Sequence, residues 1–363
     1  MLKTIFIPNN SIASYVLLYT KAGMRNESYD EIGIAHLTEH VLLALLSKNM
    51  KKKYGMTING YTRKEYTTYV IHGTQYDLKY STYLFEELID IIFNFNDNSS
   101  VEEIINKQKM VVSEEEKRII NNSFTIAALN KIQSEILNDG LNNNLIGIES
   151  KIMQSSYSEI KKFISNNYNY FIIVIVAGTA SICPNIINRY EKYNYMVSEN
   201  MQSIALNAEA PHKKFTYYVP EIEIRYTGWS IDRPRNLKEH IIYDLLVNIY
   251  NATTNNEGIE VKYLNYSDQA MIMEINKAAS NNTCEGILKP INIGRKFHSL
   301  KDSYVLQLTE LLQTDRFIAD FAVKANHLYN ETGEPDYWLT KILDITENDV
   351  INALCRLNST IIL

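Results

Sequence analysis

The segment from Gly33 to His40, Gly-Ile-Ala-His-Leu-Thr-Glu-His, is the part of the chain from which the fold is best inferred. His36 and His40 are four positions apart, so on a helix they lie one turn apart on the same face. Glu39 lies at the rim of that face. Two neutral imidazoles and one further ligand form an open zinc site with a water in the fourth position, and a nearby carboxylate can accept the proton of that water. The segment therefore indicates a metal site that still needs a third ligand.

The same segment also fits a second interpretation. The apolar run 41–46 follows His40 directly, and a histidine on a mostly apolar helix is often a packed core residue. The order His-x-x-Glu-His is the inverted form of the helix motif of zinc peptidases, although so short a motif can occur by accident. The choice depends on whether other parts of the chain supply a third ligand and a substrate site.

The length and composition indicate a folded protein of two domains. The chain has 363 residues, which is more than one hydrophobic core usually serves. Hydrophobic residues make up 45% and charged residues 21% of the chain, as in globular proteins. The net charge of −6 argues against a nucleic-acid partner, which requires a basic face.

The cysteines and the apolar runs favour a cytoplasmic protein without a membrane span. Cys183, Cys284 and Cys355 are odd in number and far apart, which fits a reducing compartment better than a disulfide framework. The N-terminus lacks the apolar core of a signal peptide. The longest apolar run, 171–177, is too short to cross a bilayer.

The order of the predicted elements favours an α+β fold, in which two α/β sandwich domains each pack helices on one face of an antiparallel or mixed sheet. β-Branched and aromatic runs predict the strands, and apolar positions at helical spacing predict the helices. In the first half, strands are expected at 14–22, 57–62, 66–71 and 170–177, and helices at 32–47, 77–94, 101–121, 124–138 and 158–166. In the second half, strands are expected at 215–219, 223–230, 260–266, 269–275 and 358–363, and helices at 237–250 and 304–329.

Three consecutive glutamates on the helix predicted at 101–121 are candidates for the third ligand. Glu114, Glu115 and Glu116 point in three directions around a helix, so at most one of them can face the two histidines easily. A charge run of this kind is also typical of a solvated helix face. Periodicity alone leaves the choice among them open.

The chain resembles the family of pitrilysin, insulin-degrading enzyme and mitochondrial processing peptidase. The segment 33–40 is similar to the family signature Gly-x-Ala-His-x-x-Glu-His. Further similarity extends over the first half of the chain. Residues 22–27 resemble the family's loop before the zinc helix, and Asn-Gly-Tyr-Thr at 59–62 resembles its edge strand Asn-Ala-x-Thr. Residues 111–115 resemble the segment with the third ligand, and 173–178 resemble the strand and glycine that close the first domain.

The resemblance implies a complete set of zinc ligands. His36, His40 and Glu115 would bind one zinc ion per chain, and Glu39 would activate the water. The 74 residues between His40 and Glu115 suit the interval of the family. The two glutamates on either side of Glu115 remain alternatives to it.

Gln108 stands seven positions before Glu115, where family members often carry a glutamate that supports the site. A glutamine can still form a hydrogen bond to a metal ligand, but it cannot carry charge. The resemblance therefore implies a supporting role for Gln108 and raises the question of how active the site is.

Asn59, Gly60, Tyr61 and Thr62 are expected to bind the substrate. An extended peptide can pair with an exposed strand edge through main-chain hydrogen bonds. The four residues lie between the two predicted zinc-binding helices, which favours this role over that of an ordinary edge strand with a turn at Asn-Gly.

The second half resembles, mainly in the order of its elements, the inactive homologous domain of half-length family members. We expect a zinc-binding catalytic domain at 1–195, a linker at 196–214 and the inactive domain at 215–363, which together form half of a clamshell. Active family members carry an arginine and a tyrosine in their second half that stabilise the oxyanion. Lys262 and Tyr266 are the nearest equivalents here, and a lysine lacks the forked guanidinium.

A zinc half without the arginine and tyrosine is the division seen in heterodimers of this family. The resemblance implies a zinc-dependent endopeptidase that cleaves small peptides in a chamber formed with a homologous partner subunit, which supplies the missing pair. Precursor or leader peptides, such as those of bacteriocins, are the implied substrates. The alternative is a catalytically weak or inert subunit that binds peptides or assembles such a complex.

Overall fold

The computed structural model describes residues 2–10, 12–49, 56–74, 76, 78–96, 99–122, 124–137, 148–178, 213–254, 258–277, 288, 293–331 and 333–359. Its contacts divide the chain into two compact units. Unit 1 comprises Met1–Asn122, Asn144–Gln202 and Asp315–Val323, and unit 2 comprises Ser123–Asn143, Ser203–Thr314 and Lys324–Leu363.

Each unit takes in a short segment from the opposite half of the chain. Helix α4 (Phe124–Leu137) belongs to unit 2, and the first turns of helix α10 (Asp315–Tyr329) belong to unit 1. The sequence did not suggest this exchange, because each segment is an ordinary amphipathic helix whose partner sheet is not encoded locally. Only the last two positions of the expected linker at 196–214 are among the described residues, so that boundary stays a prediction.

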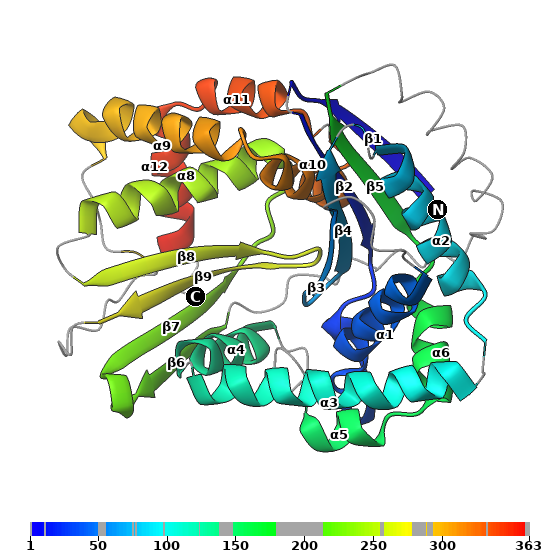
Figure 1. The fold of residues 1–363 in the computed structure, drawn as a ribbon. Helices are drawn as coiled ribbons and strands as arrows, with labels where there is room; N and C mark the ends of the chain where they lie inside the picture. The colour runs from blue at the N-terminus through cyan, green and yellow to red at the C-terminus, as the bar shows by residue number, and fades with distance from the viewer. Residues whose placement is uncertain are drawn as a thin grey trace. The chain divides into compact units, whose positions relative to one another are not determined.

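Unit 1 contains a mixed five-stranded sheet in the order β1-β5-β2-β4-β3, in which β1 runs parallel to β5 and the other neighbours are antiparallel (Figure 1). Strand β5 is an uninterrupted apolar run that is buried along its whole length, as expected of an inner strand. Strand β3 forms an edge of the sheet and is only partly buried. The strands are β1 (Leu2–Pro8), β2 (Ala13–Thr20), β3 (Thr57–Thr62), β4 (Thr67–Thr74) and β5 (Phe171–Ala177).

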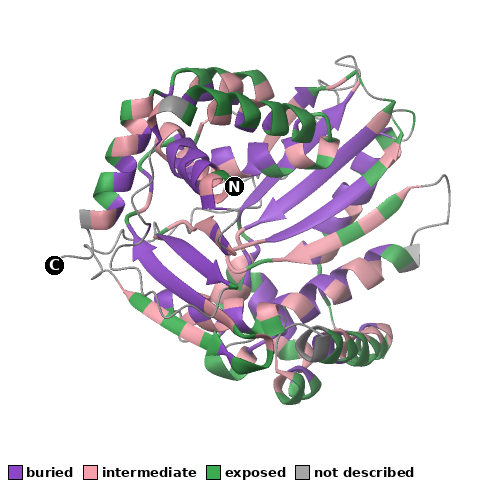
Figure 2. Ribbon diagram, turned by 90° about the vertical axis from the view of Figure 1, so that its left-hand side faces the viewer, coloured by how far each residue is buried: buried purple, intermediate pink, exposed green. Residues whose placement is uncertain are grey.

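A set of helices packs on one face of this sheet. Their apolar sides share a core with alternate strand residues, among them Val16, Leu18 and Ile71. The residues between these, such as Leu17 and Val70, are also buried, so both faces of the inner strands are covered; Figure 2 shows the strands mostly in the colour of buried residues. The helices are α1 (Ile34–Asn49), α2 (Leu78–Phe93), α3 (Ser99–Asn122), α5 (Glu149–Gln154) and α6 (Tyr157–Asn167).

Unit 2 contains an antiparallel four-stranded sheet in the order β6-β7-β9-β8. Helix α8 packs on the face that carries Tyr263, whereas α4 packs on the face that carries Met271 and Met273. The strands are β6 (Lys214–Val219), β7 (Ile224–Ile231), β8 (Ile259–Asn265) and β9 (Ala270–Asn276), and the further helices are α8 (Leu237–Thr254), α9 (Phe297–Leu311), α11 (Pro335–Leu343) and α12 (Glu347–Ser359).

The predicted fold class is confirmed, since the chain contains two sheets with helices packed on them. The second half also repeats the β-β-α-β-β order of the first. The clamshell arrangement stays a prediction.

The secondary structure differs from the sequence-based prediction in several places. The helix expected at 304–329 is divided into α9 and α10, with a break at 312–314, and the helices α5, α11 and α12 were not predicted. The strand at 2–8 was not expected; it is fixed by parallel pairing with β5, a contact made across more than 160 residues that no local pattern reports. The final strand expected at 358–363 is wrong at its first two positions, because Asn358 and Ser359 continue helix α12. The remaining residues of that segment, 360–363, lie outside the described part of the chain.

Within the described residues, no helix combines the length and apolarity that crossing a bilayer requires.

Gly228 allows helix α4 to lie directly on strand β7. A Cβ atom at this position would stand 2.4 Å from Ile132 Cγ2 and 3.2 Å from Ile136 Cγ1, both on α4. We expect Gly228→Ala to lower the free energy of unfolding of unit 2 by about 1–3 kcal/mol, because the helix must move outward to make room. Urea denaturation followed by tyrosine and tryptophan fluorescence measures the change.

The matched control is the double variant Gly228→Ala/Ile132→Ala. Shortening Ile132 removes the atom that the new methyl group meets, so adding Gly228→Ala to Ile132→Ala is expected to cost much less than adding it to the wild type. Equal costs in the two backgrounds would contradict the direct contact.

Candidate metal centre

Three side chains from two helices converge on one point in unit 1. His36 and His40 lie on α1, and Glu115 lies on α3, which packs beside α1 (Figure 1). One ligand atom from each residue lies within 4.8 Å of the other two. No other group of three or more His, Cys, Asp or Glu side chains among the described residues is arranged in this way.

The geometry of the three residues suits a small divalent ion. The imidazoles of His36 and His40 have centroids 4.7 Å apart and are nearly perpendicular at 89°. His40 Nε2 lies 3.6 Å from Glu115 Oε2. A tetrahedral zinc site with bonds near 2.1 Å places its ligand atoms about 3.4 Å apart, so small side-chain rotations bring this set into place. Two imidazole nitrogens and one carboxylate oxygen are also the donor atoms of open zinc sites.

The site keeps an open side. All three side chains are only partly buried; His40 is 19% and Glu115 is 33% exposed. A structural zinc site is closed by four protein ligands, whereas a catalytic site leaves a position for water or substrate. The partial exposure of a three-residue set corresponds to the open type.

The structure distinguishes the three consecutive glutamates on α3. Glu115 faces the histidines, Glu114 points to solvent, and Glu116 is buried away from the site, where burial raises the pKa of its carboxyl group. Helix α3 turns by about 100° per residue, so these three positions cannot share one direction. Glu115 is thus the one of the three whose carboxylate joins the histidines.

Gln108 contacts the ring of His40 on the side away from Glu115. Gln108 Oε1 lies 3.4 Å from His40 Nδ1, while Nε2 of the same ring faces Glu115. If Nδ1 carries the proton and donates it to the amide oxygen, the lone pair of Nε2 points into the metal site. Such a partner fixes both the tautomer and the orientation of a ligand histidine.

Glu39 is buried between the histidine pair and the edge strand. Its side chain is 3% exposed, and its Oε2 accepts a hydrogen bond of 2.8 Å from Thr62 Oγ1 on β3. Burial raises the pKa of Glu39 to about 7; the bond from Thr62 opposes this shift, and the nearby charge of Glu115 adds to it. A carboxyl group with a pKa near neutrality can exchange protons at physiological pH.

Gly60 provides the space for the Glu39 carboxyl group. A Cβ atom on Gly60 would stand 2.4 Å from Glu39 Oε1 and 2.7 Å from its Cδ. Strand alternation places Gly60 and Thr62 on the face of β3 toward Glu39, and Asn59 and Tyr61 on the opposite face. Two of the four residues expected to bind substrate therefore contact the expected base, which the sequence alone did not reveal.

The N-terminus of α1 is held by Glu27, a residue to which sequence reasoning assigned no role. Glu27 is buried, and its two carboxyl oxygens accept hydrogen bonds from the backbone N–H groups of Gly33 (3.0 Å) and Ala35 (2.8 Å). These N–H groups belong to the first turn, where a helix has no internal acceptors. Glu27 thus fixes the start of the helix at Ile34, two residues before His36.

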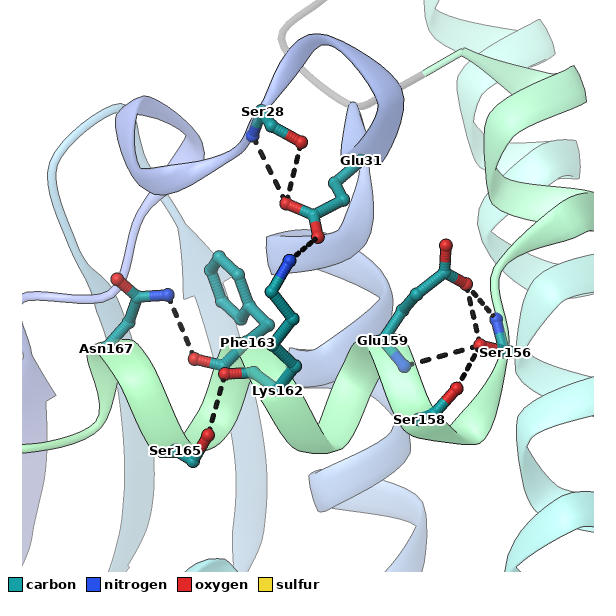
Figure 3. Close-up of polar contacts among 9 residues, drawn as sticks. All are labelled: Ser28, Glu31, Ser156, Ser158, Glu159, Lys162, Phe163, Ser165 and Asn167. Carbon is teal, nitrogen blue, oxygen red and sulfur yellow. Dashed lines mark hydrogen bonds and ion pairs between the residues drawn. The ribbon is translucent and has the colours of Figure 1, made fainter.

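The loop before α1 is also attached to α6 (Figure 3) and to α5. Glu31 accepts a hydrogen bond from Ser28 Oγ (2.8 Å) and pairs with Lys162 on α6 at 3.1 Å. Lys151 on α5 pairs with Asp30 at 2.8 Å. Surface pairs of this kind contribute little stability individually, but together they connect the loop to two helices of the same unit.

The remaining candidates lie in unit 2 or outside the described residues. Lys262, on β8 of unit 2, pairs with Glu260 at 3.3 Å, and the backbone N–H of Tyr266 donates to Gln269 at the β8–β9 turn. Cys355 is an exposed free thiol. The other two cysteines lie outside the described residues.

Comparisons with known proteins agree with the fold. The model of a family described as Insulinase (Peptidase family M16) matches residues 4–147. No curated protein sequence matches the chain. A protease from Helicobacter pylori superposes with a TM-score of 0.72 at 16% identity, covering 97% of this chain and 93% of that one. The periplasmic protease PqqL from Escherichia coli gives 0.66 at 13% identity, covering 99% and 45%, and a chain of complex III2 from Candida albicans gives 0.65 at 14%, covering 97% and 89%.

These findings agree on the fold and relate the first part of the chain to one family. The fold, built from two α/β units, is shared with the Helicobacter pylori protease, and unit 1 carries a possible His-His-Glu metal site. Residues 4–147 match the model of the insulinase peptidase family, and the whole chain shares its fold with proteases of known structure. It spans nearly the whole length of the Helicobacter pylori protease but less than half of the PqqL chain.

Replacing Gln108 by leucine is expected to weaken zinc binding by about 10-fold to 100-fold, because the His40 ring loses the acceptor that holds its tautomer. Competition with a chromophoric chelator measures the zinc dissociation constant. Gln154→Leu, at an exposed position on α5, is the matched control and should leave the constant unchanged. An unaltered constant in Gln108→Leu would show that the contact plays no part in binding.

The steric conflict between a side chain at position 60 and Glu39 can be tested by protein stability, without an activity assay. In metal-free protein, Gly60→Ala should lower the free energy of unfolding by about 1–3 kcal/mol. The φ angle of Gly60 is not in the left-handed region, so alanine is compatible with the backbone. In a Glu39→Ala background, Gly60→Ala should change the free energy of unfolding by less than about 0.5 kcal/mol, because the side chain that the new methyl group would meet has been removed. A cost that is independent of residue 39 would contradict the contact.

Proposed function

We propose that the chain is a zinc-dependent endopeptidase. The observation that carries the proposal is the position of Glu39, which lies beside the His36–His40–Glu115 group and at the same time against the edge strand β3. A candidate base, a set of metal ligands and a strand edge that can pair with a peptide backbone are thus neighbours in space.

Each group has a defined task in this proposal. His36, His40 and Glu115 would hold the zinc ion, which supplies a Lewis acid and lowers the pKa of a bound water. Glu39 accepts the proton of the attacking water and returns it to the nitrogen of the departing peptide, a role for which a pKa of about 7 is well suited. Thr62 keeps the Glu39 carboxyl group in place through its hydrogen bond.

The substrate in this proposal is an extended peptide that adds to β3. The free edge of β3 faces no other strand of the described sheet, so its main-chain groups are accessible for pairing. Pairing through the main chain leaves side-chain selectivity to residues around the strand. We propose that small precursor or leader peptides are the natural substrates, with bacteriocin precursors as one example.

We further propose that a homologous partner subunit completes the active site. The chain corresponds to less than half of the PqqL chain. Lys262, the nearest equivalent of the expected arginine, is a lysine that pairs with Glu260. The partner would provide the donors that stabilise the tetrahedral oxyanion. If the chain alone cleaves peptides at the full rate of the complex, the partner is unnecessary. The cytoplasmic location stays a prediction.

A second candidate function is that of an inert subunit that binds peptides or assembles a complex. The neutral Gln108 favours it, since a carboxylate at this position would strengthen the basicity of His40 more than an amide does. The similarity to a chain of complex III2, an assembly, is compatible with either function.

Cleavage of a quenched fluorescent peptide by the purified chain, alone and with its co-purified partner, separates the two functions. Glu39→Gln should retain about one zinc per chain and lose activity by about 10²-fold to 10⁴-fold, because the proton acceptor has been removed. Glu114→Gln is the matched control. It removes a charge from the exposed residue next to Glu115 on α3, and the variant should be fully active. Chelation should abolish cleavage, and added zinc should restore it.

A folded chain that holds no zinc would rule out the enzyme. A Glu39→Gln variant that cleaves at the rate of the wild type would likewise exclude the assigned base and leave the inert subunit as the better interpretation.

A further inference from the structure

Strand β3 carries a second set of side chains on the face opposite Glu39. Asn59 and Tyr61 point to this side, and Asn59 Nδ2 donates a hydrogen bond of 3.1 Å to Tyr61 Oη. The bond fixes the position of the phenol ring. Tyr61 therefore presents a fixed aromatic surface beside the free edge of the strand.

Arg316 covers this aromatic surface. It lies in the first turn of α10, in the segment Asp315–Val323 that belongs to unit 1 together with β3. Its guanidinium carbon lies 4.7 Å from the centre of the Tyr61 ring, a distance at which a cation and an aromatic ring attract each other. The sequence offered no signal for this pair, because 254 positions separate the two residues in the chain.

The guanidinium group of Arg316 is oriented but not saturated. Its Nε lies 3.8 Å from Asp320 Oδ2, one turn further along α10, and the side chain is 54% exposed. Within the described part of the chain, neither Nη atom of Arg316 forms a hydrogen bond or ion pair. An arginine held at Nε and at its ring face directs its two Nη groups outward, and this fork matches the two oxygens of a carboxylate.

A peptide that adds to β3 brings every second side chain to this position. In such pairing, the substrate residue opposite Gly60 or Thr62 points toward Glu39, whereas the residue opposite Tyr61 points to the face that carries Arg316. The acceptor of the Arg316 fork would thus be a single substrate side chain, with its two neighbours turned away.

We propose that Tyr61 and Arg316 form a subsite for an acidic side chain of the peptide substrate. The proposal rests on the proposed function to the extent that a peptide pairs with β3, and it adds a chemical preference that main-chain pairing cannot supply. Tyr61 positions the guanidinium group, and Arg316 selects the carboxylate. The subsite accepts glutamate or aspartate at one position and disfavours lysine there.

A binding assay tests the subsite independently of cleavage. Zinc-loaded Glu39→Gln protein is titrated against fluorescent, extended host peptides of Thr, Val, Ser and Gln, in which a single glutamate is moved along the sequence. We expect one position at which glutamate tightens binding about fivefold relative to glutamine, with no gain at the positions directly before and after it. The gain should shrink as the salt concentration rises, because the site is partly exposed to solvent.

The variants of Arg316 complete the test. Arg316→Gln should remove the preference for glutamate without weakening the binding of the neutral host peptide. Arg316→Glu should shift the preference to lysine. Arg235→Gln, an exposed arginine of unit 2, removes the same charge elsewhere and should leave the preference intact.

The proposal is overturned if glutamate still tightens binding in Arg316→Gln. It is also overturned if the affinity is the same wherever the glutamate stands in the peptide, or if no peptide binds. Cleavage of the neutral host peptide by the wild type is measured in parallel. Cleavage without a positional preference refutes the subsite and leaves the peptidase intact. A positional preference in a wild-type chain that binds no zinc, and that cleaves no peptide even with its co-purified partner, supports the subsite and refutes the peptidase.

Discussion

The close approach of strand β3 to helix α1 is the constraint on which the candidate site depends. It is possible only because Gly60 has no side chain, so that the carboxyl group of Glu39 can occupy the space where a Cβ would stand. The same approach buries Glu39, raises the pKa of its carboxyl group and places its Oε2 within reach of Thr62. A single small residue therefore controls the environment of the expected base and its distance from the strand that would bind the substrate.

The second constraint is the placement of α1 itself. Glu27 binds the first-turn N–H groups of the helix, and the preceding loop is attached to α5 and α6 by ion pairs. With the start of α1 fixed, the one-turn spacing of His36 and His40 determines where both imidazoles lie. The packing of α1 against α3 then decides which glutamate can meet them. The backbone of α1 and α3 thus sets where the site residues lie, and side-chain contacts from Gln108 and Thr62 orient His40 and Glu39.

The two units also show how a repeated architecture can exchange parts. Helix α4 leaves the first half of the chain to cover the sheet of unit 2, where it fits over Gly228, and the start of α10 returns from the second half to join unit 1. The second exchange places Arg316 over Tyr61. A segment from the second half of the chain therefore contributes a charged group beside the edge strand of unit 1.

The sequence by itself determined the elements whose pattern is local. The spacing of His36, Glu39 and His40 predicted the helix of the candidate metal site. The apolar run of β5 and the β-branched and aromatic content of β2 and β4 predicted inner strands, and the order of the elements predicted the α+β class. The sequence narrowed the third ligand to three adjacent glutamates, and the resemblance to a known family selected one. Tertiary structure decided whatever depends on contacts between distant segments: the parallel pairing of β1 with β5, the choice of Glu115 by the rotation of α3 against α1, the contact of Gly60 with Glu39, and the stacking of Arg316 on Tyr61. Periodicity reports which face of an element is apolar, but it does not report which other element that face will meet.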